Sequence, residues 1–172
     1  MIEIRALTPG DDRSTFRSGD PDLDRFFLRF AGQNQFRHHL GVTYIAAEAG
    51  NILGFATVAA AQIEVAELPA SLTAGLPRYP LPVLRLARLA VSECARGRGI
   101  GQMLVRFVLA LGHATATRIG CAGVLVDAKA GAVTFYEKLG FLKIGVLAGE
   151  LGDRPLPTAL FLPLGSVPLG AG

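Results

Sequence analysis

The stretch RLARLAVSECARGRGIGQML, residues 85–104, constrains the fold of this chain more than any other. Its first part alternates apolar and polar residues, which predicts a half-buried strand. Leu104, Val108 and Leu111 then recur at helical spacing, which predicts an amphipathic helix over 101–120. The turn that joins strand to helix, residues 96–101, holds three glycines and two arginines.

This glycine–arginine turn has the local chemistry of an anion site. The first amides of a helix have no partner inside the helix, and the helix dipole is positive there. Glycines let a ligand approach the backbone without a Cβ in the way. We therefore expect the turn to suit a diphosphate, with Arg96 and Arg98 adding charge-assisted hydrogen bonds. The alternative is a plain tight turn with solvated arginines.

Two common nucleotide-binding loops fit the turn less well. A P-loop needs Gly-Lys followed by Ser or Thr, and the turn has none. The dinucleotide fingerprint Gly-x-Gly-x-x-Gly does not match glycines at 97, 99 and 101. It also requires an acidic residue about 20 positions further on, and the sequence near Ile119 and Gly120 has none.

The rest of the chain alternates strands with helices, which predicts a mixed α/β sheet. The expected strands cover residues 2–7, two segments of 43–63 around a turn at 49–51, 83–91, 121–128, 141–147 and 158–164. The expected helices cover residues 18–35, 101–120 and 132–140. Residues 67–82 contain four prolines and predict an irregular connection beside a site. We expect one domain over residues 1–165 and a frayed tail over 166–172.

The first expected helix has clear start signals. Asp20 can cap it and Pro21 fits its first position. Its stripe of Leu23, Phe27, Phe30 and Ala31 is typical of a face packed in a core. Gly140 similarly predicts the end of the 132–140 helix.

Composition places the chain among globular proteins, with 51% hydrophobic and 18% charged residues. No apolar run reaches the roughly 18 residues that cross a bilayer, and the first residues do not resemble a signal peptide. We expect a cytoplasmic protein. Cys94 and Cys121 are expected to be buried free thiols rather than a disulfide, and no His/Cys spacing indicates a metal site.

Positive charge is concentrated in one segment. The whole chain has a formal charge of +3, but residues 78–118 hold seven arginines and one acidic residue. Such a segment is either a solvated face or a surface for a polyanion.

The motif Arg96-x-x-Gly99-x-Gly101 is similar to the acetyl-coenzyme A motif of the GNAT N-acetyltransferases. The strand LARLAV before it and AVTFYEKLGF after it match the family in order and distance, and the resemblance covers about residues 2–164. It implies a GNAT fold whose mixed sheet is splayed at the acetyl-CoA site, with helices on both faces. It also implies that the cofactor-binding residues are Leu89, Ala90, Val91, Arg96, Gly97, Arg98, Gly99, Ile100, Gly101, Gln102, Ala132 and Phe135.

Three longer stretches resemble a subfamily, the GNAT toxins of type II toxin–antitoxin modules. They are FRSGDPDLDRFFLRFAGQNQ, RYPLPVLRLARLAV and VLVDAKAGAVTFYEKLGF. The resemblance implies acetylation of the α-amine of aminoacyl-tRNA, a ribbon-helix-helix antitoxin as partner, and a homodimer. One departure is the glycine at 131, close to where the subfamily often has an acidic residue.

The family resemblance also implies that Tyr136 is the general acid, because the hydroxyl of this tyrosine lies near the coenzyme sulfur. A phenol with a pKa near 10 can protonate a thiolate of comparable basicity. The alternative is that Phe135 and Tyr136 are only an aromatic pair on a buried helix. Asp127 and Glu93 are candidates for a general base, although helix-capping or surface roles fit them as well.

Several arginines are candidates for substrate contacts. Arg78, Arg85 and Arg88 lie in or after the proline-rich connection, where an acceptor is expected to bind. Arg85 and Arg88 point to opposite faces of a regular strand, so they share one surface only if the strand is bulged. Further basic residues near the first helix could extend a phosphate track; these are Arg25, Arg29 and Arg37. His38 and His39 are expected to be solvated loop residues.

Two other functions stay open at this stage. The chain could be a GNAT enzyme for another amine, such as a protein N-terminus, a lysine or a small molecule. It could also be a fold that binds coenzyme A or an antitoxin without chemistry.

Overall fold

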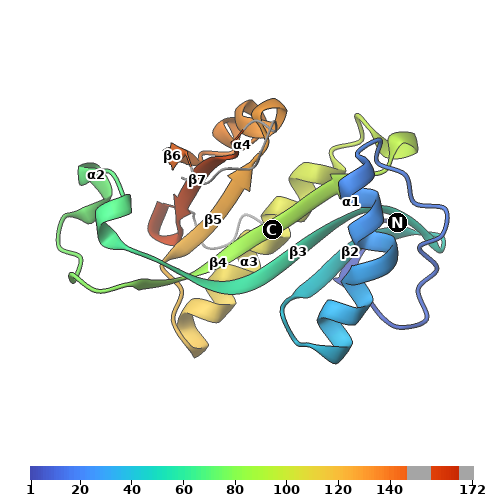
Figure 1. Ribbon diagram of the computed structural model, residues 1–172, viewed down its shortest axis with the longest axis horizontal. Helices are drawn as coiled ribbons and strands as arrows, with labels where there is room; N and C mark the ends of the chain where they lie inside the picture. The colour runs from blue at the N-terminus through green and yellow to red at the C-terminus, as the bar shows by residue number, and fades with distance from the viewer. Residues whose placement is uncertain (147–155, 167–172) are drawn as a thin grey trace. The chain divides into compact units, whose positions relative to one another are not determined.

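The computed structural model describes residues 1–146 and 156–166, and these residues form a mixed α/β fold (Figure 1). One sheet has seven strands in the order β1-β2-β3-β4-β5-β7-β6. The strands are β1 (Glu3–Ala6), β2 (Val42–Glu48), β3 (Asn51–Ile63), β4 (Leu81–Val91), β5 (Gly123–Ala128), β6 (Leu142–Val146) and β7 (Thr158–Pro163). The predicted fold class is confirmed.

Four α-helices and several short helical turns connect the strands. The α-helices are α1 (Pro21–Arg25), α2 (Ala70–Thr73), α3 (Ile100–Arg118) and α4 (Val133–Lys138). The 3-10 turns are Val65–Glu67, Glu93–Ala95, Ala130–Ala132 and Leu164–Ser166. From residue 167 onward, the predicted frayed tail lies outside the described residues.

The chain divides into two compact units. The first unit comprises residues 1–59 and 86–108, and the second comprises residues 60–85 and 109–172. The expectation of one domain over residues 1–165 stays a prediction.

Helices cover both faces of the strands in the first unit. Phe55 of β3 stacks on Phe27 with ring centroids 4.3 Å apart, in a core cluster that also contains Phe16 and Ile45. The neighbouring residue, Gly54, faces the opposite side, because side chains alternate along a strand. A Cβ at Gly54 would lie only 2.9 Å from the side chain of Ile100, so β3 and α3 pack too closely for any larger residue.

The first helix runs continuously from Pro21 to Arg37, but part of it is π-helical. Asp20 accepts hydrogen bonds from two amides of the first turn, as predicted. The predicted stripe is wrong at Phe30, which is 44% exposed, whereas Phe26 is buried. The π-helical turns Phe26–Phe30 and Gln33–Arg37 are the cause, because their i→i+5 bonds shift the phase of the buried face.

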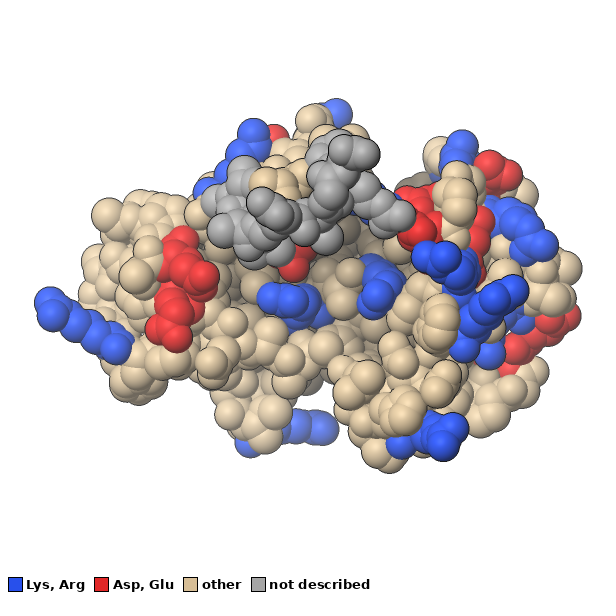
Figure 2. Space-filling view, viewed as in Figure 1, with Lys and Arg blue, Asp and Glu red and all other residues tan. Residues whose placement is uncertain are grey.

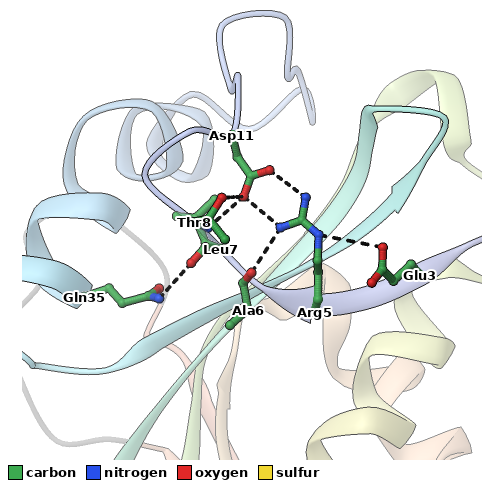
Figure 3. A network of polar contacts seen from close by, with 7 residues as sticks. All are labelled: Glu3, Arg5, Ala6, Leu7, Thr8, Asp11 and Gln35. Carbon is green, nitrogen blue, oxygen red and sulfur yellow. Dashed lines mark hydrogen bonds and ion pairs between the residues drawn. The ribbon is translucent and has the colours of Figure 1, made fainter.

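A polar network fixes the segment between β1 and the first helix (Figure 3). Arg5 donates two hydrogen bonds to the carboxylate of Asp11, at 2.7 and 2.9 Å. The amide and hydroxyl of Thr8 donate to the same carboxylate. Gln35 donates to the carbonyl of Leu7, which ties the helical segment to the end of β1.

In the second unit, β7 pairs antiparallel with both β5 and β6. One apolar cluster includes Leu125 and Phe161 together with Leu81 and Val83 of β4. On β5, the side chain next to Leu125 is Val124, which faces Gly112 of α3.

The C-terminal end of α4 has the predicted glycine. Gly140 has a φ of +95°. The amide of Phe141 donates to the carbonyl of Tyr136 at 3.1 Å, so the carbonyls of the last turn are satisfied.

The hairpin between β2 and β3 also agrees with the sequence. Ala49 and Gly50 both have positive φ, as a tight hairpin turn requires. Between Glu67, where a 3-10 turn ends, and Leu81, where β4 begins, the connection contains the short helix α2, which agrees with its prolines.

The predicted burial of the two cysteines is wrong. Cys94 is exposed on the turn after β4, and Cys121 is only partly buried before β5; both are free thiols. Each lies just beyond a strand rather than within one, so the apolar runs beside them do not bury them. Among the described residues, no helix has the length and apolar character to cross a membrane.

Candidate functional site

The glycine–arginine turn lies between β4 and α3, as predicted. β4 ends at Val91, and the amide of Ser92 donates to the carbonyl of Leu53 on β3 at 2.8 Å. The 3-10 turn Glu93–Ala95 follows, with Ala95 buried. Ile100 then begins α3 with its side chain in the core. Buried residues on both sides therefore hold the exposed turn in place.

The backbone of this turn is open to a ligand. Gly97 and Gly99 have φ of +76° and +75°, a left-handed conformation that glycine adopts without strain. A Cβ at either position would meet nothing within 4 Å. The amide of Met103 donates to the carbonyl of Gly99, and the helical amides before it have no acceptor inside the helix. This geometry fits a diphosphate at the N-terminus of the 19-residue helix α3.

Both arginines of the turn have partners within the first unit. Arg96 donates through Nη2 to the carbonyl oxygen of Ser18 at 2.6 Å. The same atom lies 3.8 Å from a carboxylate oxygen of Glu93. Arg98 donates to Glu48 at 2.8 Å, and this contact lowers the pKa of the Glu48 carboxyl. Both guanidinium groups are thus bound to oxygen atoms of the protein itself.

Tyr136 lies on α4 with only 4% of its surface exposed. Phe135 and Phe141 contact its ring edge-on, at centroid distances of 5.0 and 5.5 Å. Burial raises the pKa of Tyr136 above its usual value, so the hydroxyl is protonated at neutral pH. Ala132 and Phe135, the other predicted cofactor residues here, are half-buried.

The last part of β4 carries the remaining predicted cofactor residues. Leu89 and Val91 are half-buried, and Ala90 is part of the core cluster of the first unit. Arg88 stacks on the Phe26 ring, with its guanidinium carbon 3.8 Å from the centroid. Partial burial lowers the pKa of Arg88, which stays far above neutrality.

Arg85 and Asp127 form a loose ion pair in the second unit. Their closest charged atoms, Nη1 and Oδ2, are 3.7 Å apart, which is longer than a charge-assisted hydrogen bond. Nε of Arg85 and Oδ1 of Asp127 are buried and make no hydrogen bond among the described residues. Buried polar atoms normally have a partner, so this pair has unused hydrogen-bonding capacity.

The other candidate residues lie on the surface. Arg78 is exposed on the proline-rich connection, and so are His38 and His39 after the first helix. Where α1 lies, basic and acidic side chains are interspersed on the face drawn in Figure 2. Among the described residues, no group of three His, Cys, Asp or Glu side chains could hold a metal ion.

The helix expected over 18–35 included Ser18 and Gly19, but in the structure these residues form a turn before α1 that contacts the candidate site directly. Ser18 bonds Arg96 across 78 positions of sequence. A contact so distant in sequence leaves no periodicity or spacing signal.

Comparison with known proteins gives the family. Residues 39–143 match the model of the acetyltransferase (GNAT) domain. The tRNA-acetylating toxin of Mycobacterium tuberculosis is 32% identical over 126 residues, which are 72% of this chain and 74% of that protein. The chain belongs to the GNAT acetyltransferase family. It is an N-acetyltransferase with acetyl-CoA as acetyl donor.

Solved structures place the chain near the toxins of this family. AtaT complexed with acetyl-methionyl-tRNAfMet has a TM-score of 0.84 and 27% identity, covering 97% of each chain. A Tyr-to-Phe mutant of AtaT, bound to the C-terminus of the antitoxin AtaR and acetyl-CoA, has a TM-score of 0.75 and 27% identity. This structural match covers 96% of this chain and 95% of the AtaT chain. The resemblance to the GNAT toxins is confirmed.

Proposed function

We propose that this enzyme acetylates the α-amine of aminoacyl-tRNA and so blocks translation. The observation that carries the proposal is the 32% identity over 126 residues to a tRNA-acetylating toxin. The similarity to AtaT in complex with acetylated methionyl-tRNA supports the same substrate class.

The acetyl donor, acetyl-CoA, is held by the turn after β4. The amides of residues 97–102 bind the diphosphate, because two of these residues are glycines with open space beside them. The backbone of Leu89–Val91 pairs with the pantetheine arm in the manner of a neighbouring strand, and the family resemblance adds Ala132 and Phe135 as coenzyme contacts. Bound in this way, acetyl-CoA supplies the acetyl group as a thioester.

The α-amine of aminoacyl-tRNA, the acetyl acceptor, needs little help from a base to act as a nucleophile. A free α-amine has a pKa near 8, and an adjacent ester lowers it further, so much of it is neutral at pH 7. A lysine amine, with a pKa near 10.4, would need a strong base. A dedicated general base is therefore unnecessary for aminoacyl-tRNA.

Tyr136 acts as the general acid. The amine nitrogen forms the new C–N bond, the C–S bond breaks, and the Tyr136 hydroxyl gives its proton to the departing sulfur. The amine loses its extra proton to water, and Tyr136 is reprotonated. The backbone amide of the strand near Val91 donates a hydrogen bond to the carbonyl oxygen. Support for this role comes from the match of Tyr136 to the tyrosine of the family motif; burial raises its pKa, which keeps the hydroxyl protonated but makes it a weaker acid.

The proposed acceptor contacts are Arg78, Arg85 and Arg88. The basic residues Arg25, Arg29 and Arg37 extend the contacts to tRNA phosphates. A ribbon-helix-helix antitoxin neutralises the enzyme in the cytoplasm, and the active form is a homodimer; similarity to AtaT bound to AtaR supports an antitoxin.

The decisive experiment supplies labelled acetyl-CoA and a set of charged tRNAs, then looks for N-acetyl-aminoacyl products after ester hydrolysis. Parallel reactions contain an N-terminal peptide, a lysine peptide and a small amine. We expect label on at least one aminoacyl-tRNA and much less on the other amines. Labelling of another amine with no charged tRNA modified would overturn the proposed substrate.

A further inference from the structure

We propose that Arg96 is a positioning residue: its guanidinium group fastens the acetyl-CoA-binding turn to the Ser18–Gly19 turn instead of binding phosphate itself. The contact from Nη2 to the Ser18 carbonyl is short, 2.6 Å. A carbonyl oxygen is a strong acceptor for a charged donor. The side chain therefore holds two chain segments together, 78 positions apart.

The Ser18–Gly19 turn is itself fixed to the first helix. The amide and hydroxyl of Ser18 donate to the same carboxylate oxygen of Asp24, at 2.9 and 2.6 Å. Asp24 lies on α1, which is capped by Asp20 and continues to Phe27 in the core. A connected series of contacts thus runs from the core of the first unit to the cofactor-binding turn.

Two backbone hydrogen bonds support the same placement. The amide of Glu93 donates to the carbonyl of Arg17 at 2.8 Å. The amide of Ser92 donates to the carbonyl of Leu53 on β3. Together with Arg96 they fix the 3-10 turn just before Gly97, and hence the direction of the amides that follow.

Gly19 makes this packing possible. It has a φ of +89°. A Cβ there would lie 2.8 Å from Nη2 of Arg96 and 2.8 Å from Oε1 of Glu93. A methyl group would push the ends of these two flexible side chains away and separate Arg96 from the Ser18 carbonyl, while the protein keeps the arginine and its charge.

Because a Cβ at Gly19 would displace the Arg96 side chain, Gly19→Ala is a specific test of the positioning role of Arg96. The inference rests on the proposed binding of the diphosphate by residues 97–102. If Arg96 only positions the turn, moving its side chain weakens acetyl-CoA binding. If Arg96 binds phosphate directly, freeing it from Ser18 leaves binding unchanged or improves it.

The matched control is Gly50→Ala. Gly50 has a φ of +83° in the hairpin turn of the same unit, and a Cβ there meets nothing within 4 Å. Both variants thus carry similar backbone strain, but only Gly19→Ala displaces Arg96. We expect calorimetry to give an acetyl-CoA Kd about tenfold higher for Gly19→Ala than for Gly50→Ala, with kcat at saturating acetyl-CoA unchanged within about twofold.

A double-mutant cycle identifies the route of the effect. Arg96 is largely exposed, so Arg96→Ala should fold as the parent does. We expect Arg96→Ala to raise the Kd by a similar factor, and Gly19→Ala to add nothing in that background. If Gly19→Ala is too unstable to purify, Asp24→Ala loosens the Ser18–Gly19 turn without touching Arg96; a raised acetyl-CoA Kd then supports the positioning role, and an unchanged Kd overturns it.

The outcomes separate this inference from the proposed function. If the parent enzyme does not bind acetyl-CoA, the proposed diphosphate site falls, and the inference with it. If the parent binds but Gly19→Ala matches Gly50→Ala, Arg96 does not position the turn. A loss in Arg96→Ala without a loss in Gly19→Ala would assign the arginine to direct phosphate contact.

Discussion

The proposed reaction depends most on one functional group, the hydroxyl of Tyr136. Tyr136→Phe removes it and keeps the ring that packs against Phe135 and Phe141. We expect kcat to fall about a hundredfold or more, with the Kd for acetyl-CoA unchanged. Single-turnover rates and calorimetry would measure the two quantities separately.

Tyr44→Phe is the matched control for that prediction. Tyr44 is a partly buried tyrosine that packs on Phe107 at 4.8 Å, and burial raises its pKa as well. It therefore tests the general effect of losing a shielded hydroxyl. If both variants had the same activity, Tyr136 would be an aromatic core residue and not the acid.

At this scale, the motifs predicted the place of the glycine–arginine turn better than they predicted burial. The turn at 96–101 lies between β4 and α3, as its residue types and spacing indicate, whereas the role of Tyr136 stays a prediction. Cys94 and Phe30 were misplaced, because burial depends on where a strand ends or a helix changes pitch. Ser18 and Gly19 could not be predicted, since their role exists only once Arg96 folds against them.

Among the elements, the first helix depends on its cap. The Asp20 carboxylate accepts hydrogen bonds from the amides of Asp22 and Leu23, at 3.0 and 3.2 Å. Asp20→Ala should lower the free energy of unfolding by about 1 kcal/mol. Asp20→Asn should lose much less, because asparagine caps equally well. Urea unfolding with an unchanged m-value would measure both, and equal losses would contradict the capping role.

The segment after β1 gives a prediction for acid stability. Hydrogen bonds from Arg5, then from Thr8, hold the pKa of the Asp11 carboxyl well below its usual range (Figure 3). A lowered pKa stabilises the fold above the unfolded value near 3.9, and this contribution is lost as pH falls toward the folded value. Because Arg5 is partly exposed, we expect about 1 kcal/mol at neutral pH.

Asp11→Asn tests this contribution by difference. The parent protein should be more stable than the variant between pH 5 and 7 by a constant amount, and the difference should shrink below about pH 4. Urea unfolding of both proteins at pH 6 and pH 3 would measure it. A difference that is the same at both pH values would show that Asp11 acts through its shape and not its charge.

For the whole molecule, the order of strands and helices predicted a mixed α/β sheet, and the resemblance of its motifs to the family added the GNAT fold. The helix caps and hairpin turn follow from local rules. The π-helical turns do not follow from such rules, because Phe26 and Phe30 fit either helical phase until Phe55 packs against one of them. Nor could charge pairing be predicted: the segment 78–118 looks uniformly basic. Arg85 and Arg98 nevertheless have acidic partners elsewhere in the chain.

Ion pairs with acidic residues of the chain decide which arginines are left to bind a polyanion. The salt dependence of tRNA binding measures the contribution of each arginine. Arg88 stacks on Phe26 and has no ion pair among residues 1–146 and 156–166. If it contacts a tRNA phosphate, Arg88→Ala should lower the slope of log Kd against log salt concentration by up to about 1. Arg118→Ala, in the last turn of α3, removes the same charge from a residue that is not among the proposed acceptor contacts and should leave the slope unchanged. Binding of one purified tRNA, measured by fluorescence anisotropy from 50 to 300 mM salt, gives each slope. Equal slopes for both variants would mean that the basic segment is a solvated face, and that shape alone selects the tRNA.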